Sequence, residues 1–248
     1  MSLLELKDVT MAYGGKVKAL DNVNLKVEKG DWLAVMGPSG SGKTTLMNII
    51  GCMDHATSGT VLLDGIDITK VSDHELTLLR RDKIGIVFQQ FHMIPYLTAI
   101  ENIMAAQYYH SIPDKKEALE ALDRVGLADR ADHLPSQLSG GEQQRVCIAR
   151  AIACRSELIL FDEAVSSLDA HTQVQIMDLL LDLKEKLGLT YIFITHDLTS
   201  ITYFCSRVIF LKDGSVVADS PVSELSKLDV PYAKELLGAV LDFNAESA

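Results

Sequence analysis

One loop near the start of the chain constrains its fold more than any other feature. Residues 37–44 read Gly-Pro-Ser-Gly-Ser-Gly-Lys-Thr and match the pattern G-x-x-x-x-G-K-[ST] of a phosphate-binding loop. An apolar run of strand length, residues 32–36, precedes the loop, and residues 45–50 resemble the first turns of a buried helix. The alternative is a glycine-rich turn before a helix. The strand–loop–helix context favours the phosphate loop.

Each part of this loop has a chemical reason. Glycines allow backbone N–H groups to converge on phosphate oxygens, and the helix N-terminus adds the positive end of its dipole. We expect the side chain of Lys43 to reach the β- and γ-phosphates and the hydroxyl of Thr44 to hold Mg²⁺. The residues assigned to the nucleotide are Gly37, Pro38, Ser39, Gly40, Ser41, Gly42, Lys43 and Thr44.

Composition excludes some function classes. The 248 residues carry a net charge of −11, and no Lys/Arg cluster is long enough to indicate a nucleic-acid-binding face. The four cysteines are scattered, which is typical of reduced thiols in a cytosolic protein. No apolar run approaches the ~18 residues of a membrane-spanning helix, and the N-terminus lacks a signal-peptide pattern. If the protein works at a membrane, we expect another chain to supply the membrane part.

Strand and helix patterns alternate along the chain. Amphipathic strands are predicted at residues 4–9, 20–27 and 59–65, and apolar strands at 32–36, 84–88, 158–161 and 191–195. A helix follows over about 174–187, and a late hairpin turns at Asp213-Gly214. This order predicts an α/β fold with a mostly parallel sheet, flanked by antiparallel strands, with ligands at the carboxyl ends of the parallel strands.

A helical block interrupts this pattern. Residues 91–153 are predicted as a helical subdomain inserted into the core, with one helix over residues 114–125 that stops at Gly126. The predicted organisation is a single domain over residues 1–248. Residues 1–90 and 154–220 form the α/β core with its β subdomain, and 221–248 form a tail with a short helix at 231–240.

Polar residues follow three of the apolar strands. Gln89, Asp162 and His196 come after strands whose ends should share the edge of the phosphate loop. Asp162 is placed to reach Mg²⁺, and Glu163 to orient or deprotonate the attacking water. The alternative for the two acids is an exposed strand end. A histidine after a strand is, by itself, more often structural.

A second candidate anion site precedes the helix of residues 143–153. Ser139 and Glu142 fit the capping box S-x-x-E, which alone explains both residues. A capping box does not explain the consecutive Gly140 and Gly141. A serine hydroxyl, glycine amides and a helix N-terminus together can bind an anion.

With these motifs in order, the chain resembles the ATP-binding cassette (ABC) ATPases, the P-loop NTPase (RecA-like) subunits that drive ABC transporters. The resemblance covers essentially the whole chain. It implies that Gly37 to Thr44 are Walker A, that Gln89 is the glutamine that senses Mg²⁺, and that Tyr13 stacks on adenine. It also implies that Asp162 and Glu163 are Walker B and the catalytic glutamate, that residues 167–169 are the D-loop, and that His196 contacts the γ-phosphate. The implied site residues are as follows: Glu163, His196 and Lys43 in catalysis; Thr44, Gln89 and Asp162 at the metal; and Tyr13, residues 37–45 including Thr45, Gln89, Ser139, Gly141 and Glu142 at the nucleotide.

The resemblance also gives the second anion site a partner. In this family the signature, here residues 138–142, contacts the γ-phosphate on the P-loop of a second subunit. We therefore expect Mg²⁺ and two ATP molecules sandwiched in a head-to-tail homodimer or heterodimer. We also expect transmembrane subunits, a solute-binding protein if the transporter imports, and a location on the inner face of the cell membrane. Coupling is expected through residues 89–103, although core packing explains their apolar side chains equally well.

The chain departs from the family pattern at Glu142, where many members have Gln, and at Ala164-Val165 after the acidic pair. An added carboxylate near the ATP of the partner could weaken the closed dimer. The front half resembles the MacB/LolD group, whereas the back half and tail resemble nickel and peptide importers. Glu142 also fits an FtsE-like ATPase that signals to a membrane partner without transport. A third alternative is a soluble ABC ATPase of DNA repair or translation. Those of repair carry long coiled-coil insertions and those of translation fuse two cassettes, and this sequence shows neither feature.

Overall fold

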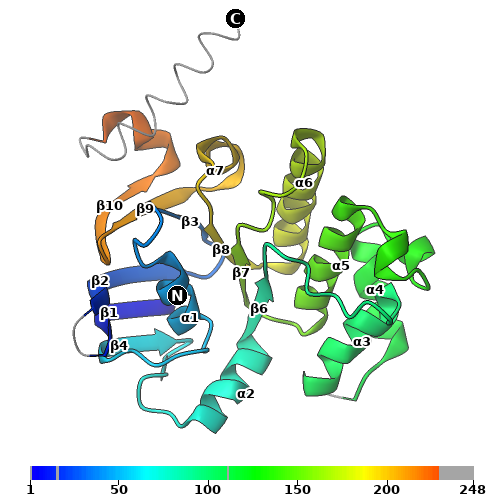
Figure 1. The fold of residues 1–248 in the computed structure, drawn as a ribbon, viewed down its shortest axis with the longest axis horizontal. Helices are drawn as coiled ribbons and strands as arrows, with labels where there is room; N and C mark the ends of the chain where they lie inside the picture. The colour runs from blue at the N-terminus through cyan, green and yellow to red at the C-terminus, as the bar shows by residue number, and fades with distance from the viewer. Residues whose placement is uncertain (1, 15–16, 111, 229–248) are drawn as a thin grey trace, which may run out of the picture. The chain divides into compact units, whose positions relative to one another are not determined.

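A computed structural model describes residues 2–14, 17–110 and 112–228. Their contacts divide the chain into two compact units: residues 1–72 with 191–248, and residues 73–190. Both units contain strands and helices, in the order drawn in Figure 1. The predicted helix at 231–240 lies outside the described residues, and the predicted domain boundaries stay a prediction.

The first unit contains an antiparallel sheet of four strands in the order β2-β1-β4-β5. These strands are β1 (Ser2–Tyr13), β2 (Val17–Glu28), β4 (Ser58–Leu63) and β5 (Ile66–Asp67). Asp64 and Gly65 turn the β4–β5 hairpin with φ of 48° and 81°, the left-handed pair that an Asp-Gly hairpin turn adopts. The alternating residues of the sequence thus form the predicted amphipathic sheet.

The same unit holds the strand that leads into the phosphate loop. β3 (Trp32–Met36), buried at every residue, pairs in parallel with β8 (Thr190–Ile194) and with β9 (Arg207–Lys212). β10 (Ser215–Pro221) continues antiparallel to β9, as the predicted hairpin requires. Helices α1 (Lys43–Ile50) and α7 (Leu198–Phe204) and the short 3-10 helix η3 (Val222–Lys227) complete the unit. No helix was predicted from the sequence at the position of α7.

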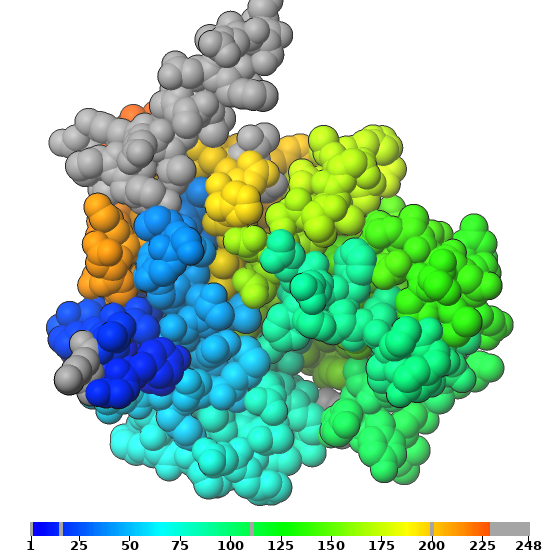
Figure 2. All heavy atoms as spheres, viewed as in Figure 1, coloured from blue at the N-terminus to red at the C-terminus, as the bar shows by residue number. Residues whose placement is uncertain are grey.

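The second unit combines a strand pair with helices. β6 (Ile84–Val87) and β7 (Leu158–Asp162) pair in parallel, and α2 (Asp73–Lys83) and α6 (Ala170–Leu187) flank them in sequence. Three further helices pack on one another: α3 (Ala99–His110), α4 (Lys115–Arg124) and α5 (Gly140–Ala153). They form the green block of Figures 1 and 2, with 3-10 turns η1 (Ala128–Arg130) and η2 (Pro135–Gln137) between α4 and α5.

Local signals explain where these helices begin and end. Asp114 caps α4 by accepting hydrogen bonds from the N–H groups of Lys116 and Glu117, and Asp169 caps α6 in the same way through Thr172. Gly188 ends α6 in the left-handed conformation, with φ of 65°. The predicted start of α4 and end of α6 therefore have identifiable caps.

Candidate nucleotide-binding site

The phosphate loop presents an uncapped helix end. Gly42 stands at the N-cap of α1 with φ of 103°, and no described side chain caps this helix. A helix of eight residues therefore begins with N–H groups that no side chain satisfies, and a bound anion can accept their hydrogen bonds. A bound phosphate is predicted from the sequence at this position.

Lys43 bridges the loop. Its ammonium donates hydrogen bonds to the carbonyl oxygens of Gly37, at 2.7 Å, and of Pro38, at 3.0 Å. The side chain is half-buried, whereas Thr44 beside it is exposed. The positive charge is thus held against the loop, where a phosphate would meet it.

Two different constraints require glycine in this loop: close packing at Gly37 and Gly42, and a left-handed backbone at Gly40. A Cβ at Gly37 would lie 2.2 Å from the carbonyl oxygen of Leu211, and one at Gly42 would lie 2.4 Å from that of Ala19. Gly40 faces open space but has φ of 77°. The hydroxyl of Ser41 is buried and has no hydrogen-bond partner among the described residues. The loop is therefore a tightly packed cradle rather than a free turn.

This packing predicts a large difference between two glycine-to-alanine variants. Gly42→Ala should lower the free energy of unfolding by more than about 3 kcal/mol, because backbone strain adds to a clash with a backbone oxygen. Gly40→Ala is the control: it has the strain without the clash, and should cost about 1–2 kcal/mol. Urea unfolding measures both. Equal losses would show that close packing does not fix the loop.

The first unit also carries Tyr13 and His196. Tyr13 ends β1 and is 46% exposed, and its hydroxyl donates a 3.5 Å hydrogen bond to Asp54. His196 follows β8 and is exposed. The structure thus leaves the ring of Tyr13 and the imidazole of His196 accessible in the unit that contains the phosphate loop.

The acidic pair lies in the second unit. Asp162 ends β7, and Glu163 follows with a left-handed φ of 48°, a conformation that costs about 1–2 kcal/mol outside glycine. The carbonyl oxygen of Glu163 accepts hydrogen bonds from the N–H group of Ser166, at 3.1 Å, and from its hydroxyl, at 2.8 Å. The amide of Gln89 lies 3.4 Å from the same hydroxyl. Ser166, which sequence reasoning missed, thus joins two predicted site residues.

The signature forms the predicted capping box. Glu142 Oε2 accepts hydrogen bonds from the N–H group and the hydroxyl of Ser139, both at 2.8 Å, and Ser139 Oγ accepts one from the N–H group of Glu142 at 3.3 Å. Arg130 Nε donates to Glu142 Oε1 at 3.2 Å. Hydrogen bonds from Ser139, followed by that from Arg130, lower the pKa of Glu142 below its ordinary value.

Gly141 has a structural reason of its own. A Cβ there would lie 2.6 Å from the methyl group of Thr172 on α6. Gly140 has looser neighbours, with the nearest atom, on Leu168, at 3.6 Å. The close approach that the second glycine permits is therefore, at least in part, an approach of α5 to α6 within this chain.

Sequence reasoning also missed the residues that hold the segment after Gln89. Arg150 on α5 donates to the carbonyl oxygens of His92, at 3.0 Å, and Phe91, at 3.1 Å. Buried Asn102 on α3 donates to three carbonyl oxygens between residues 94 and 98 and accepts from the N–H group of Ile94. A short polar residue in an apolar helix is the signal that could have identified Asn102.

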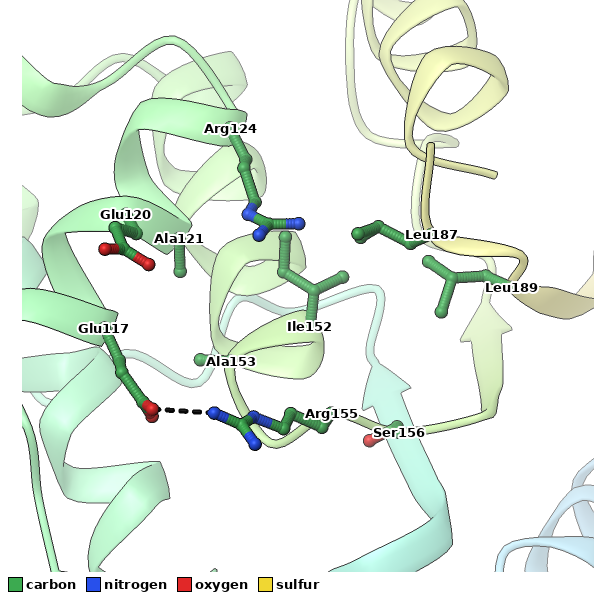
Figure 3. Close-up of a pocket in the computed structure, with 10 residues that line it drawn as sticks. All are labelled: Glu117, Glu120, Ala121, Arg124, Ile152, Ala153, Arg155, Ser156, Leu187 and Leu189. Atoms are coloured by element: carbon green, nitrogen blue, oxygen red, sulfur yellow. Dashed lines mark hydrogen bonds and ion pairs between the residues drawn. The ribbon is translucent and has the colours of Figure 1, made fainter. Parts of the chain in front are cut away.

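One pocket contains none of the predicted site residues. It has a volume of about 280 Å³ and lies between α4, the end of α5 and the residues around Gly188 (Figure 3). Arg155 pairs with Glu117 at its edge at 2.7 Å, and Arg124 points from α4 toward Ile152. Because this pocket lacks predicted nucleotide-site residues, substitutions in it are suitable controls.

Within the ranges 2–14, 17–110 and 112–228, no group of three or more His, Cys, Asp or Glu residues could hold a metal ion. No helix in those ranges is long and apolar enough to cross a membrane.

Comparison with known proteins places this site in a family. Residues 20–166 match the ABC transporter family. The ABC transporter ATP-binding protein MJ0796 of Methanocaldococcus jannaschii is 47% identical over 224 residues, which cover 86% of this chain and 95% of that protein. The macrolide export ATP-binding/permease protein MacB of Escherichia coli O157:H7 is 41% identical over 228 residues, covering 90% of this chain and 35% of MacB. The pyoverdine export ATP-binding/permease protein PvdT of Pseudomonas entomophila is 43% identical over 231 residues, which cover 90% of this chain and 35% of PvdT.

Solved structures agree with the sequence relatives. The dimeric structure of MJ0796 in a post-hydrolysis state, bound to ADP and Pi, matches with a TM-score of 0.79 and 44% identity, covering 88% of this chain and 98% of that one. The ADP conformation of MJ1267, another ATP-binding cassette, matches with a TM-score of 0.82 and 27% identity over 96% of this chain.

This chain belongs to the ABC transporter family and is an ATP-binding cassette of the kind found in MJ0796 and MacB. It is an ATPase whose hydrolysis of ATP drives transport. The predicted P-loop NTPase fold, a mostly parallel sheet with an antiparallel β subdomain and a helical subdomain, is confirmed.

Proposed function

We propose that ATP is bound by residues 37–45 with Tyr13 and is hydrolysed by water that Glu163 activates, with His196 at the γ-phosphate. The phosphate loop carries this proposal, because an uncapped helix N-terminus and the Lys43 ammonium are held together against the same carbonyl-lined loop. In-line phosphoryl transfer needs little beyond such positioning and charge stabilisation. Glu163, with its constrained backbone, supplies the base.

The proposal includes Mg²⁺. Thr44, Asp162 and Gln89 offer hydroxyl, carboxylate and amide oxygens, and Mg²⁺ prefers oxygen donors while keeping several waters and phosphate ligands. When bound, the ion would neutralise charge on the β- and γ-phosphates.

We further propose that two copies form the complete ATPase. MJ0796 forms a dimer in two solved structures, at 44% and 45% identity to this chain. Ser139 and the N-terminus of α5 are exposed, and a pocket of about 270 Å³ lies beside them. In a head-to-tail dimer this end of α5 would face the γ-phosphate of the partner.

A groove in the second unit fits the membrane partner. It has a volume of about 590 Å³ and lies between α2, β6, α3 and α5. Its wall includes Ile84, Phe88 and Ala106, and Arg150 beside it holds the segment after Gln89. MacB and PvdT are ATP-binding/permease proteins. We propose that an apolar helical segment of a permease docks here and senses nucleotide through Gln89.

Filling this groove should uncouple the cassette from its permease. Ala106→Arg is expected to abolish co-purification of a multi-spanning permease from detergent-solubilised membranes, while ATP binding stays within about twofold, because the added side chain is large and charged. Ala153→Arg, which makes the same change in the pocket of Figure 3, is the matched control and should keep the permease. If the Ala106→Arg chain still co-purified with the permease, the proposal that the permease docks in this groove would be wrong.

The same purification addresses direction of transport. Two of the relatives above are export proteins, which favours export. A permease with a large extracytoplasmic domain would agree with export. A co-purifying solute-binding protein would indicate import instead. A permease without transport of any solute would support the mechanical alternative, which the relatives do not favour.

A further inference from the structure

Ser139, the serine of the signature, is hydrogen-bonded to the carboxylate of Glu142. The hydroxyl of Ser139 donates its single proton to Glu142 Oε2 at 2.8 Å. A hydroxyl has one proton to donate, so Ser139 cannot also donate to a phosphate while it makes this bond. The side chain of Glu142 is 29% exposed, and its carboxylate would moreover face a γ-phosphate that approaches the same helix end. Both effects oppose phosphate binding.

Arg130 offsets this charge. It lies on η1, and its Nε donates to Glu142 Oε1, whereas Ser139 donates to the other oxygen, Oε2. A second acid, Asp129, lies 3.4 Å from Nη1 of Arg130, and Arg145 lines the same pocket. Two arginines thus balance two acids around the end of α5. Without Arg130 the pocket would carry one excess negative charge.

We propose that Arg130 is a positioning residue that neutralises the charge of Glu142 and so allows the N-terminus of α5 to accept the γ-phosphate of a second copy. This inference rests on the proposed head-to-tail dimer. Arg130 acts through Glu142, not on the nucleotide, so its importance depends on the acid at position 142. That dependence distinguishes it from a residue that merely supports the fold or binds phosphate itself.

A double-mutant cycle tests this dependence. The parent is the Glu163→Gln chain, and the measurement is the ATP concentration that gives half-maximal dimer by light scattering. Arg130→Gln is expected to raise that concentration about tenfold, because it leaves the Glu142 charge unbalanced. In the Glu142→Gln background the same change should alter it less than about twofold. Arg130→Lys should restore most of the loss.

Three controls keep the cycle interpretable. Arg124→Gln removes an exposed arginine from the same helical block and should leave dimer formation unchanged. ATP binding to the monomer and the urea midpoint should not change in Arg130→Gln. If Arg130→Gln weakened dimer formation equally with and without Glu142→Gln, this inference would be overturned while the proposed dimer would stand. If ATP drives no dimer in the parent, the proposed dimer fails and the inference fails with it.

Discussion

Glu163→Gln is expected to lower the rate of ATP hydrolysis by a factor of about 10²–10⁴, the range that a general base contributes, while ATP-bound dimers accumulate. The amide has nearly the same shape as the carboxylate but cannot accept a proton from water. Glu163 is held by its carbonyl oxygen through Ser166 and not through its carboxylate alone, so the backbone turn should survive the change. Phosphate release and gel filtration with ATP measure the two effects.

The control for this prediction is Glu117→Gln. It makes the same chemical change in a half-exposed glutamate whose ion pair with Arg155 is worth at most about 1 kcal/mol. Its hydrolysis rate should equal that of the unmutated chain. A Glu163→Gln chain that hydrolyses at the unmutated rate would remove Glu163 from the role of base.

Lys43→Ala is expected to weaken ATP binding by between about tenfold and a hundredfold. Charged hydrogen bonds contribute about 1.5–3 kcal/mol, and the lost ammonium is the cation that the structure holds against the phosphate loop. Isothermal titration with ATP measures the loss. Hydrolysis should fall with it, since the same charge would stabilise the transferring phosphoryl group.

Lys7→Ala provides the comparison for Lys43→Ala. Lys7 is an exposed lysine of β1 that pairs with Glu5, so its loss should leave the affinity for ATP unchanged. Unchanged affinity in Lys43→Ala would mean that the ammonium belongs to the loop structure and not to the nucleotide.

The parts of the fold with strong local signals could be predicted from the sequence. The run Trp32–Met36 forms the buried strand before the phosphate loop, the Asp64-Gly65 turn closes its hairpin, and Ser139 with Glu142 forms the capping box. Each of these features depends on neighbours within a few residues. α7 was missed because its seven residues are too few to show helical periodicity.

The supporting contacts could not be predicted because they join residues far apart in the chain. Arg150 holds carbonyl oxygens some 58 residues earlier, and Arg130 reaches Glu142 from a 3-10 turn. Gly141 is a similar case. Its sequence suggested room for a ligand, whereas its nearest neighbour is Thr172. Such pairings follow from tertiary packing, which no local pattern encodes.

In the proposed dimer each phosphate loop is completed by the signature of a second copy, and mixing two inactive variants tests this arrangement most directly. Lys43→Ala damages the loop and Ser139→Phe damages the signature, so each alone should be nearly inactive. In a head-to-tail mixed dimer, the intact loop of one copy meets the intact signature of the other. Random mixing should therefore restore about a quarter of the unmutated ATPase rate. A mixture as inactive as either variant alone would contradict the account.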